Sequence, residues 1–321
     1  MTVMQISVLS NSRMIRSDNK IDGAEAVAAR LLNEVLSEDG WIELLSAWWA
    51  AGCGALHTDR PEHGLSNGSW DRLHQRLAAT GWFVAGGGWI RPNREGCDLL
   101  ARTNELHRAI LRDEKEDRVV AQAIDAVPRG PAVDIGCGPG HSVLRLAKMG
   151  FHPVFAYDLS PIAIGMAKAL IEHEGKSAHL FTREATGLKE IGSESLSLVF
   201  SRGALHYFNQ RALADMLKRK LKPGGYVVAE VVALGYYVQA SHLKRLVSGR
   251  WRQPLSYART VFRTSLFELA AIQPQMAAGA PEIGYTVRTI NRLARDAELR
   301  VESICKAPTS VGHLVVLRKP E

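Results

Sequence analysis

A glycine-rich loop between a buried apolar strand and a helix constrains this chain more than any other feature of its sequence. Residues 133–140 read Val-Asp-Ile-Gly-Cys-Gly-Pro-Gly, and a helical pattern follows them. Glycine lets the backbone turn sharply there and lets a ligand approach without a Cβ in the way. Dinucleotide sites use the same device, but their fingerprint has Gly or Ala where this chain has His141. The loop therefore predicts a nucleotide-like ligand at the edge of an open α/β sheet.

Strand and helix patterns alternate from residue 132 onward. We expect strands at 132–135, 153–157, 178–182, 196–201, 226–232, 300–305 and 313–317. Helical patterns separate most of them, which predicts a largely parallel sheet covered on both faces. The expected fold is thus α/β, with a Rossmann-like sheet of seven strands.

The first 105 residues have a different composition and predict a separate domain. Six of the seven tryptophans lie there. Helical patterns at 21–36, 41–51 and 70–80 precede two short strands joined by a Gly-rich turn, which is the outline of a winged helix. A charged helix over 93–126 is expected to bridge to the second domain, residues 106–321.

Charge and cysteine content narrow the class of protein. The net charge of +7 over 321 residues is mild, so it fits an anionic small molecule and falls short of the concentrated charge of nucleic-acid binders. The four cysteines are scattered, without metal-ligand spacing, which predicts reduced thiols and no metal. The absence of a signal-peptide pattern and of a long apolar run predicts a cytoplasmic protein without a membrane span.

The glycine loop resembles motif I of the class I methyltransferases that use S-adenosylmethionine (SAM). Further pieces of that family's pattern follow in order, at residues 154–161, 183–185, 196–201 and 221–225. The resemblance covers about residues 119–234 and implies SAM as the cofactor. The residues that it places against SAM are Asp134, Gly136, Cys137, Gly138, Asp158, Leu159, Glu184, Ala185 and Ser201.

Two of these positions carry most of the information about the donor. In the family, the acidic residue at the end of the second strand holds both ribose hydroxyls, and here that residue is Asp158. Its alternative role is to cap the helix that begins after Ser160. At the adenine turn, many members have Asp before a small residue, whereas this chain has Glu184-Ala185 after Arg183.

His206 is the candidate general base. It follows the fourth strand, at the carboxyl edge where open α/β sheets bind ligands. The segment resembles the Leu-His-Asp-Trp motif of O-methyltransferases with an N-terminal winged-helix dimerisation domain, in which the His is the base. Leu205 and His206 match, but Tyr207-Phe208 replaces Asp-Trp. The alternative is a His that only packs near the donor.

The region after the fifth strand, about 233–283, is expected to form a substrate lid. No Asp or Glu occurs between Val231 and Phe267, while six Lys and Arg do. Arginine binds carboxylates and phosphates in bidentate fashion, so the lid predicts an anionic substrate. The candidate substrate contacts are Tyr207, Tyr236, Tyr237, Arg259 and Arg263. A solvated helix face is the alternative.

Three functions compete at this point. The first is a SAM-dependent methyltransferase acting on a small anionic metabolite, whose N-terminal domain makes a homodimer and roofs the neighbouring active site. The second is a nucleic-acid-directed methyltransferase with that domain as reader, which the scarcity of cations on residues 70–76 disfavours. The third is a non-catalytic SAM-binding regulator.

Overall fold

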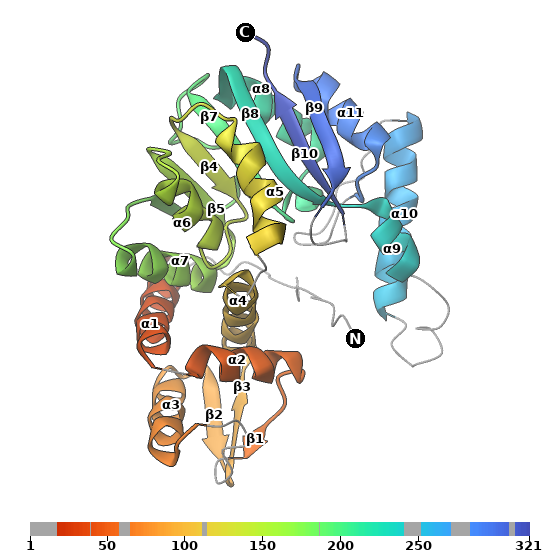
Figure 1. Ribbon diagram of the computed structural model, residues 1–321. Coiled ribbons are helices and arrows are strands. Elements are labelled where there is room, and N and C mark those ends of the chain that lie inside the picture. Colours follow the sequence, from red (N-terminus) through yellow and green to blue (C-terminus); the bar gives the residue numbers. More distant parts are fainter. Residues whose placement is uncertain are drawn as a thin grey trace.

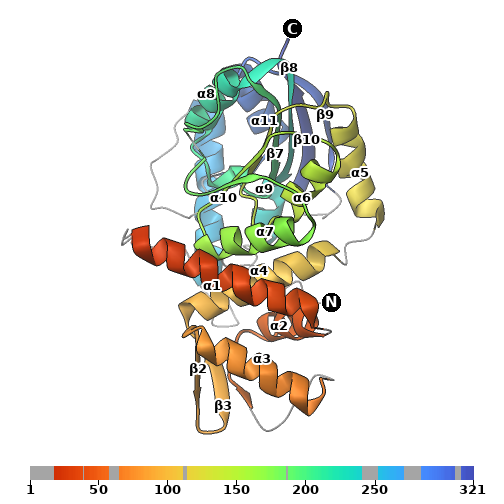
Figure 2. The same cartoon turned by 90° about the vertical axis from the view of Figure 1, so that its left-hand side faces the viewer.

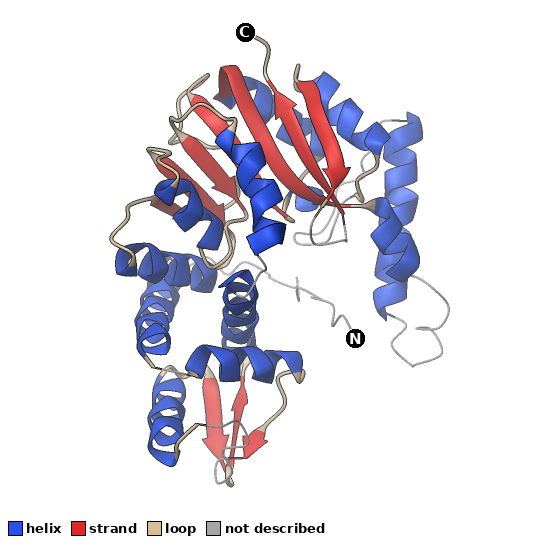
Figure 3. Ribbon diagram, in the orientation of Figure 1, coloured by secondary structure: helices blue, strands red, loops and turns tan. Residues whose placement is uncertain are grey.

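The computed structural model describes residues 18–38, 40–57, 65–110, 114–185, 187–240, 252–270, 283–307 and 312–321. These residues form an N-terminal unit of helices with a small sheet and a larger unit built on a long sheet (Figure 1 and, by type of element, Figure 3). None of the helices within these ranges combines the length and the apolarity that a bilayer crossing requires.

The larger sheet has seven strands in the order β6-β5-β4-β7-β8-β10-β9. They are β4 (Ala132–Ile135), β5 (Val154–Asp158), β6 (His179–Thr182), β7 (Leu196–Arg202), β8 (Leu221–Val232), β9 (Arg300–Lys306) and β10 (Gly312–Arg318). Only β10 runs antiparallel to its neighbours, β8 and β9. The expected Rossmann-like methyltransferase sheet is therefore confirmed. The Lys-Pro-Gly-Gly segment lies inside β8, at a shift in its register with β7.

Successive residues of each buried strand point to opposite faces and enter two separate cores. Ala132 and Phe200 pack in one core and Val133 and Val199 in the other. The first core includes α5 (Glu114–Asp125), α6 (His141–Lys148) and α7 (Pro161–His173). The second includes α8 (Gln210–Lys220) and α11 (Val287–Asp296). Helices thus cover both faces, as Figure 2 shows edge-on.

The described residues of the N-terminal unit form three helices and a three-stranded sheet of order β1-β3-β2. Its elements are α1 (Asp18–Ser37), α2 (Trp41–Ala50), β1 (Leu56–His57), α3 (Asn67–Ala79), β2 (Phe83–Gly86) and β3 (Trp89–Pro92). The helices and the hairpin agree with expectation, whereas β1 was not expected because two residues carry no strand pattern. The winged-helix-like identity of this unit stays a prediction.

The expected bridging helix over 93–126 is wrong as a single element. Two helices replace it, α4 (Arg94–Ile110) and α5, and residues 111–113 between them lie outside the described residues. The predicted boundary at 105 falls within α4, and the division into 1–105 and 106–321 stays a prediction.

The N-terminal unit packs directly onto its own α/β unit. Helix α1 lies along α7, and the two helices share one apolar core (Figures 1 and 2). Gly165 on α7 is required for this packing, because a Cβ there would lie 2.3 Å from the backbone oxygen of Glu25. Helix α4 lies below the carboxyl ends of β4 and β5. The edge of the sheet that carries the glycine loop therefore faces the N-terminal unit.

The insertion after β8 contributes two described helices. They are α9 (Leu234–Ala240) and α10 (Arg252–Ala270), which pack against each other. Arg259 is exposed and Arg263 half-buried on α10. Lys244, Arg245 and Arg250 of the basic lid lie outside the described residues.

Candidate active site

The glycine loop after β4 has the geometry that its sequence predicts. Gly136, Gly138 and Gly140 all have positive φ, at 72°, 53° and 89°. A Cβ on Gly136 would lie 2.3 Å from Cβ of Ala204, and one on Gly140 would lie 2.7 Å from Cα of Ala167. Both the backbone conformation and the lack of space therefore require glycine at these turns.

Asp158 links the glycine loop to the end of β5. Its Oδ2 accepts a hydrogen bond from the backbone N–H of Gly138 at 3.0 Å, and its Oδ1 accepts one from Ser160 N at 2.9 Å. Ser160 itself caps α7 by accepting from Ala163 N. A carboxylate has about four acceptor positions, so two remain for ligand hydroxyls. The loop-anchoring role and a ribose role are therefore compatible in one side chain.

Asp134 is a buried acid without a hydrogen-bond partner at one oxygen. The residue is 1% exposed, and its Oδ2 is buried with no hydrogen bond. Burial, with the nearby charge of Asp158, raises the pKa of Asp134 to about 8. Arg202 opposes this rise, but it is paired with Glu230 at 2.8 Å. An unpaired buried carboxyl beside a glycine loop is the kind of group that a ligand ammonium satisfies.

The remaining residues expected to contact the cofactor occupy several environments. Ser201 is buried and donates to the backbone oxygen of Ile135 at 2.8 Å, which ties β7 to β4 below the loop. Cys137 is buried, and burial raises the pKa of its thiol, so it fills space and is not ionised. Leu159 is 61% exposed beside Asp158 and offers an apolar surface. Ala185 is buried, whereas Glu184 is exposed.

His206 lies in the short 3-10 helix η1 (Leu205–Tyr207) after β7. It is 5% exposed, and its Nδ1 is buried without a hydrogen bond. Burial lowers the pKa of His206 to about 3, so its imidazole is neutral at physiological pH. The ring packs on Tyr207 with 3.9 Å between centroids and lies edge-on to Tyr237 at 6.5 Å. A neutral imidazole held between aromatic rings can accept a proton and is poorly suited to hold a positive charge.

The tyrosines expected at the substrate mouth gather around this histidine. Tyr207 is 36% exposed, Tyr236 is half-buried and Tyr237 is buried. Tyr236 and Tyr237 lie edge-on to each other at 5.6 Å on α9. The structure therefore brings His206 and all three tyrosines together. The same proximity is not established for Arg259 and Arg263, whose contact with substrate stays a prediction.

A group of charged residues on α4 adjoins the glycine loop and Asp158, and it could not be predicted from the sequence pattern. Asp98 accepts a hydrogen bond from the hydroxyl of Ser160 at 2.7 Å. Arg102 lies 3.9 Å from Oδ1 of Asp158. Glu105 lies against the loop, since a Cβ on Gly138 would be 2.6 Å from its Oε1. The spacing of these three residues on one helix resembles an ordinary solvated face, so only the fold reveals their position.

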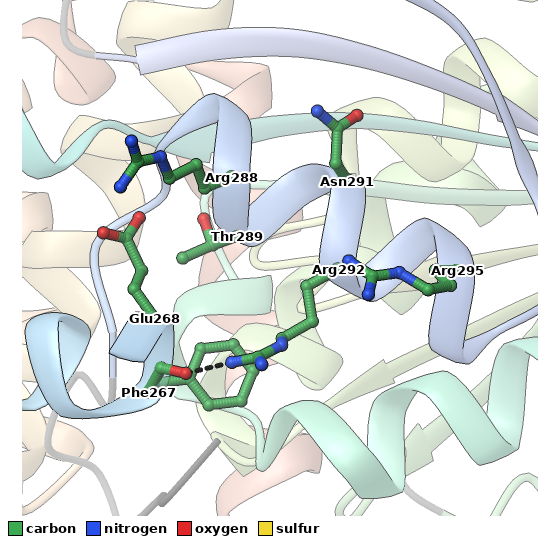
Figure 4. A pocket seen from close by; sticks show the side chains of 7 residues that line it. All are labelled: Phe267, Glu268, Arg288, Thr289, Asn291, Arg292 and Arg295. Carbon is green, nitrogen blue, oxygen red and sulfur yellow. Dashed lines mark hydrogen bonds between the residues drawn. The ribbon is translucent and has the colours of Figure 1, made fainter. Parts of the chain in front are cut away.

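A hollow of about 270 Å³ lies between α10 and α11 (Figure 4). Arg288, Arg292 and Arg295 line it together with Phe267 and Glu268. The guanidinium of Arg292 donates to the backbone oxygen of Phe267 and lies over its ring. Its lining residues belong to α10 and α11, which lie on the β9 side of the sheet (Figure 1), and do not include the glycine loop. Within the described residues, no group of three His, Cys, Asp or Glu is arranged to hold a metal.

Comparison with known proteins agrees with this geometry. The family model described as "Methyltransferase domain" matches residues 132–225. Phosphoethanolamine N-methyltransferase 1 of Zea mays is 28% identical over 166 residues, which are 50% of this chain and 31% of that protein. EEF1A lysine methyltransferase 2 of Homo sapiens is 30% identical over 155 residues, which are 48% of this chain and 51% of that protein. The chain thus spans about half or less of the length of these two relatives.

Solved structures with a related fold include a putative SAM-dependent methyltransferase from Listeria monocytogenes and N-methyltransferase NodS from Bradyrhizobium japonicum. The first has a TM-score of 0.47 and 16% identity, and the match covers 65% of this chain and 99% of that one. The second has a TM-score of 0.43 and 16% identity, with 65% of this chain and 87% of that one covered, and it was solved in complex with S-adenosyl-L-homocysteine.

The fold, the loop and the family match together define the class of this site. Residues 132–225 form a SAM-dependent methyltransferase domain of the class I type, and SAM is its cofactor. The residues present fit that cofactor. The glycine loop presents no side chain of its own at positions 136, 138 and 140, Asp158 has acceptor positions for hydroxyls, and the orphaned Oδ2 of Asp134 can take an ammonium.

Proposed function

We propose that this protein is a methyltransferase that transfers a methyl group from SAM to a small anionic metabolite, with His206 as general base. The observation that carries the proposal is the arrangement along one edge of the sheet. Asp158 and Asp134 flank the glycine loop, and the neutral His206 follows the neighbouring strand among three tyrosines. The donor-binding and acceptor-facing groups are thus adjacent.

The residues at the glycine loop would bind SAM and fix its position. Asp158 would hold the ribose hydroxyls, the glycine loop would support the amino-acid part, and Asp134 would bind its ammonium. SAM, when bound, supplies a methyl group on a sulfonium, so the leaving group is already good. The task left to the chain is to align a nucleophile with that methyl group and to remove a proton where the nucleophile arrives protonated.

His206 fits the proton-accepting role through its charge state. Burial keeps the imidazole neutral, so it can accept a proton, and the same pKa of about 3 makes it a weak base in the unliganded protein. The half-exposed Tyr207 marks the side from which an acceptor would enter. A thioether or a carbanion acceptor would need no base, so the role of His206 depends on the acceptor.

The proposed anionic acceptor rests on the basic lid. Arg259 and Arg263 lie on α10, which packs along the helix of Tyr236 and Tyr237. An arginine there suits a carboxylate or phosphate. The name of the maize relative specifies a small acceptor that carries a phosphate, whereas the name of the human relative specifies a lysine in a protein. The first fits the proposal better.

We also propose a homodimer in the cytoplasm, of the O-methyltransferase type with a winged-helix-like N-terminal domain. The core of that domain buries Trp41, Trp48 and Trp70, so these side chains are not available for a contact between copies. Its hairpin, however, exposes Val84 and 46% of Trp89, which supports an apolar contact between copies. Roofing of the neighbouring active site by this domain is part of the same proposal.

The competing nucleic-acid function is weakened by charge pairing. The two arginines of α3, Arg72 and Arg76, form ion pairs with Glu38 at 2.9 Å and with Glu34 at 3.1 Å. A reader helix needs its cations available for phosphates and base edges. The α3 surface lacks that excess of positive charge.

A turnover measurement distinguishes the proposed methyltransferase from a non-catalytic SAM-binding regulator. The purified protein would be incubated with SAM and a panel of carboxylated and phosphorylated metabolites, and mass spectrometry would follow loss of SAM and gain of methylated product. Methylation of one acceptor class, abolished in Asp158→Asn, is the expected result. Binding of SAM without any product across the panel would favour the regulator, and salt-sensitive retardation of RNA or DNA would favour the second function.

A further inference from the structure

The guanidinium of Arg102 occupies a defined position among three carboxylates. Its Nη1 donates to Oε2 of Glu105 at 3.0 Å, and its Nε lies 3.4 Å from Oδ1 of Asp98. Its Nη2 lies 3.9 Å from Oδ1 of Asp158, beyond hydrogen-bond distance. Nη1 is therefore hydrogen-bonded within α4, and Nε is ion-paired there without a hydrogen bond, while Nη2 keeps its donors for another acceptor.

The charge of Arg102 reaches both sides of the loop. Burial raises the pKa of Cys137 in the glycine loop and of Tyr207 beside His206, and the positive charge of Arg102 opposes both increases. The charge of Arg102, which lies 3.9 Å from Asp158, therefore acts both on the glycine loop and on Tyr207. Its side chain is only 21% exposed, which strengthens its interaction with a neighbouring anion.

The donor has one anionic group that this position suits. SAM consists of an adenosine part and a methionine part, and the carboxylate of the methionine part is its only negative charge. Asp134, with its orphaned Oδ2, is suited to the ammonium of the same part but not to the carboxylate. An arginine with a free nitrogen on the loop side of Asp158 supplies the missing cation.

We propose that Arg102, from helix α4 outside the matched methyltransferase region, binds the methionine carboxylate of the donor. The inference rests on the proposed function, because it assumes that the glycine loop binds SAM. Asp98 and Glu105 orient the guanidinium, and helix α4 thereby completes the donor site of its own chain.

The test compares two ligands that differ in the amino-acid part. S-adenosylhomocysteine contains the carboxylate, and methylthioadenosine lacks the whole amino-acid part while keeping the ribose and adenine. Their Kd values would be measured by calorimetry on the full-length protein and on the variants Arg102→Gln and Arg102→Lys. Arg108→Gln is the matched control, since Arg108 lies on the same helix and is exposed.

We expect Arg102→Gln to weaken binding of S-adenosylhomocysteine by roughly 10- to 100-fold and to change that of methylthioadenosine by less than about twofold. Arg102→Lys should recover part of the loss, and Arg108→Gln should bind both ligands as the wild type does. Equal weakening of both ligands would mean that Arg102 only supports Asp158 and would overturn the inference. Unchanged binding of S-adenosylhomocysteine to Arg102→Gln would overturn it as well, while leaving the proposed function intact. A wild-type protein that binds neither ligand would refute the proposed function itself.

Discussion

Oδ2 of Asp158 accepts a hydrogen bond from the backbone N–H of Gly138 at 3.0 Å. The acid at the end of β5 and the turn after β4 are therefore one structural unit. A ligand that binds the carboxylate is therefore held next to the loop. The two strongest sequence signals for the donor thus converge on a single contact.

Replacing Asp158 with Asn should weaken SAM binding by about tenfold or more. The amide keeps one acceptor oxygen but loses the charge that strengthens hydrogen bonds to hydroxyls. Calorimetric titration with SAM checks this. Asp215→Asn, on the exposed face of α8, is the control and should bind as the wild type does. Equal affinity of the Asp158→Asn and wild-type proteins would contradict a ribose role.

Asp134→Asn should stabilise the unliganded protein while weakening donor binding. Burial raises the pKa of Asp134 to about 8 in the fold, against 3.8 when unperturbed, so the fold prefers the protonated acid. Its favourable contribution is present below pH 4 and is lost as pH rises through 8. The stability difference between variant and wild type should therefore grow across pH 4–8 and reach ~1–3 kcal/mol.

Urea unfolding at several pH values measures that difference, and calorimetry measures the binding. A variant that is less stable than the wild type at pH 8 would show that Asp134 has a partner in the unliganded fold.

Protonation of His206 should not control how kcat depends on pH on the acid side of neutrality. Because burial lowers the pKa of His206 to about 3, its imidazole stays neutral from pH 5.5 upward. We expect kcat at saturating SAM to show no His206-dependent loss near pH 6.5, and His206→Ala to lower kcat by about 10²- to 10⁴-fold. Measurements of kcat against pH for the wild type and for His206→Ala check this prediction. An acid limb near pH 6.5 that disappears in the variant would contradict the burial-lowered pKa.

Two helical glycines offer a paired test of the contact between the units. In Gly165→Ala the new Cβ would lie 2.3 Å from the backbone oxygen of Glu25, so we expect a loss of ~1–3 kcal/mol in the free energy of unfolding. In Gly23→Ala on α1 the Cβ meets nothing within 4 Å, and the higher helix propensity of Ala should add ~0.5–1 kcal/mol. Chemical unfolding of both variants compares them. Similar stabilities would mean that α1 and α7 separate easily.

The parts of the fold with strong local signals were predictable. The buried strands β4, β5 and β7 and the glycine turn follow from apolar runs and from backbone conformations that only glycine adopts easily. The presence of two helices, α4 and α5, in place of one was not predictable, since the charged helical pattern of the sequence is continuous over residues 93–126. The two-residue strand β1 exists through its pairing with β3 and has no local signal.

The candidate site divides in the same way. Asp158 and His206 were identified because they stand at fixed positions after predicted strands. Arg102 was missed because its role depends on where α4 lies, and charged residues at helical spacing most often face solvent. The unpartnered Oδ2 of Asp134 likewise becomes visible only when its surroundings are known.

The apolar core shared by α1, α7 and one face of the sheet couples the two units mechanically and thermodynamically. Amides buried at such a shared core exchange with deuterium mainly through openings that disrupt both sides. A ligand held at the glycine loop would lower the population of those openings by mass action. We therefore expect the amides of α1 to exchange more slowly when a ligand fills the donor site. Protection of the glycine loop alone would not produce this effect.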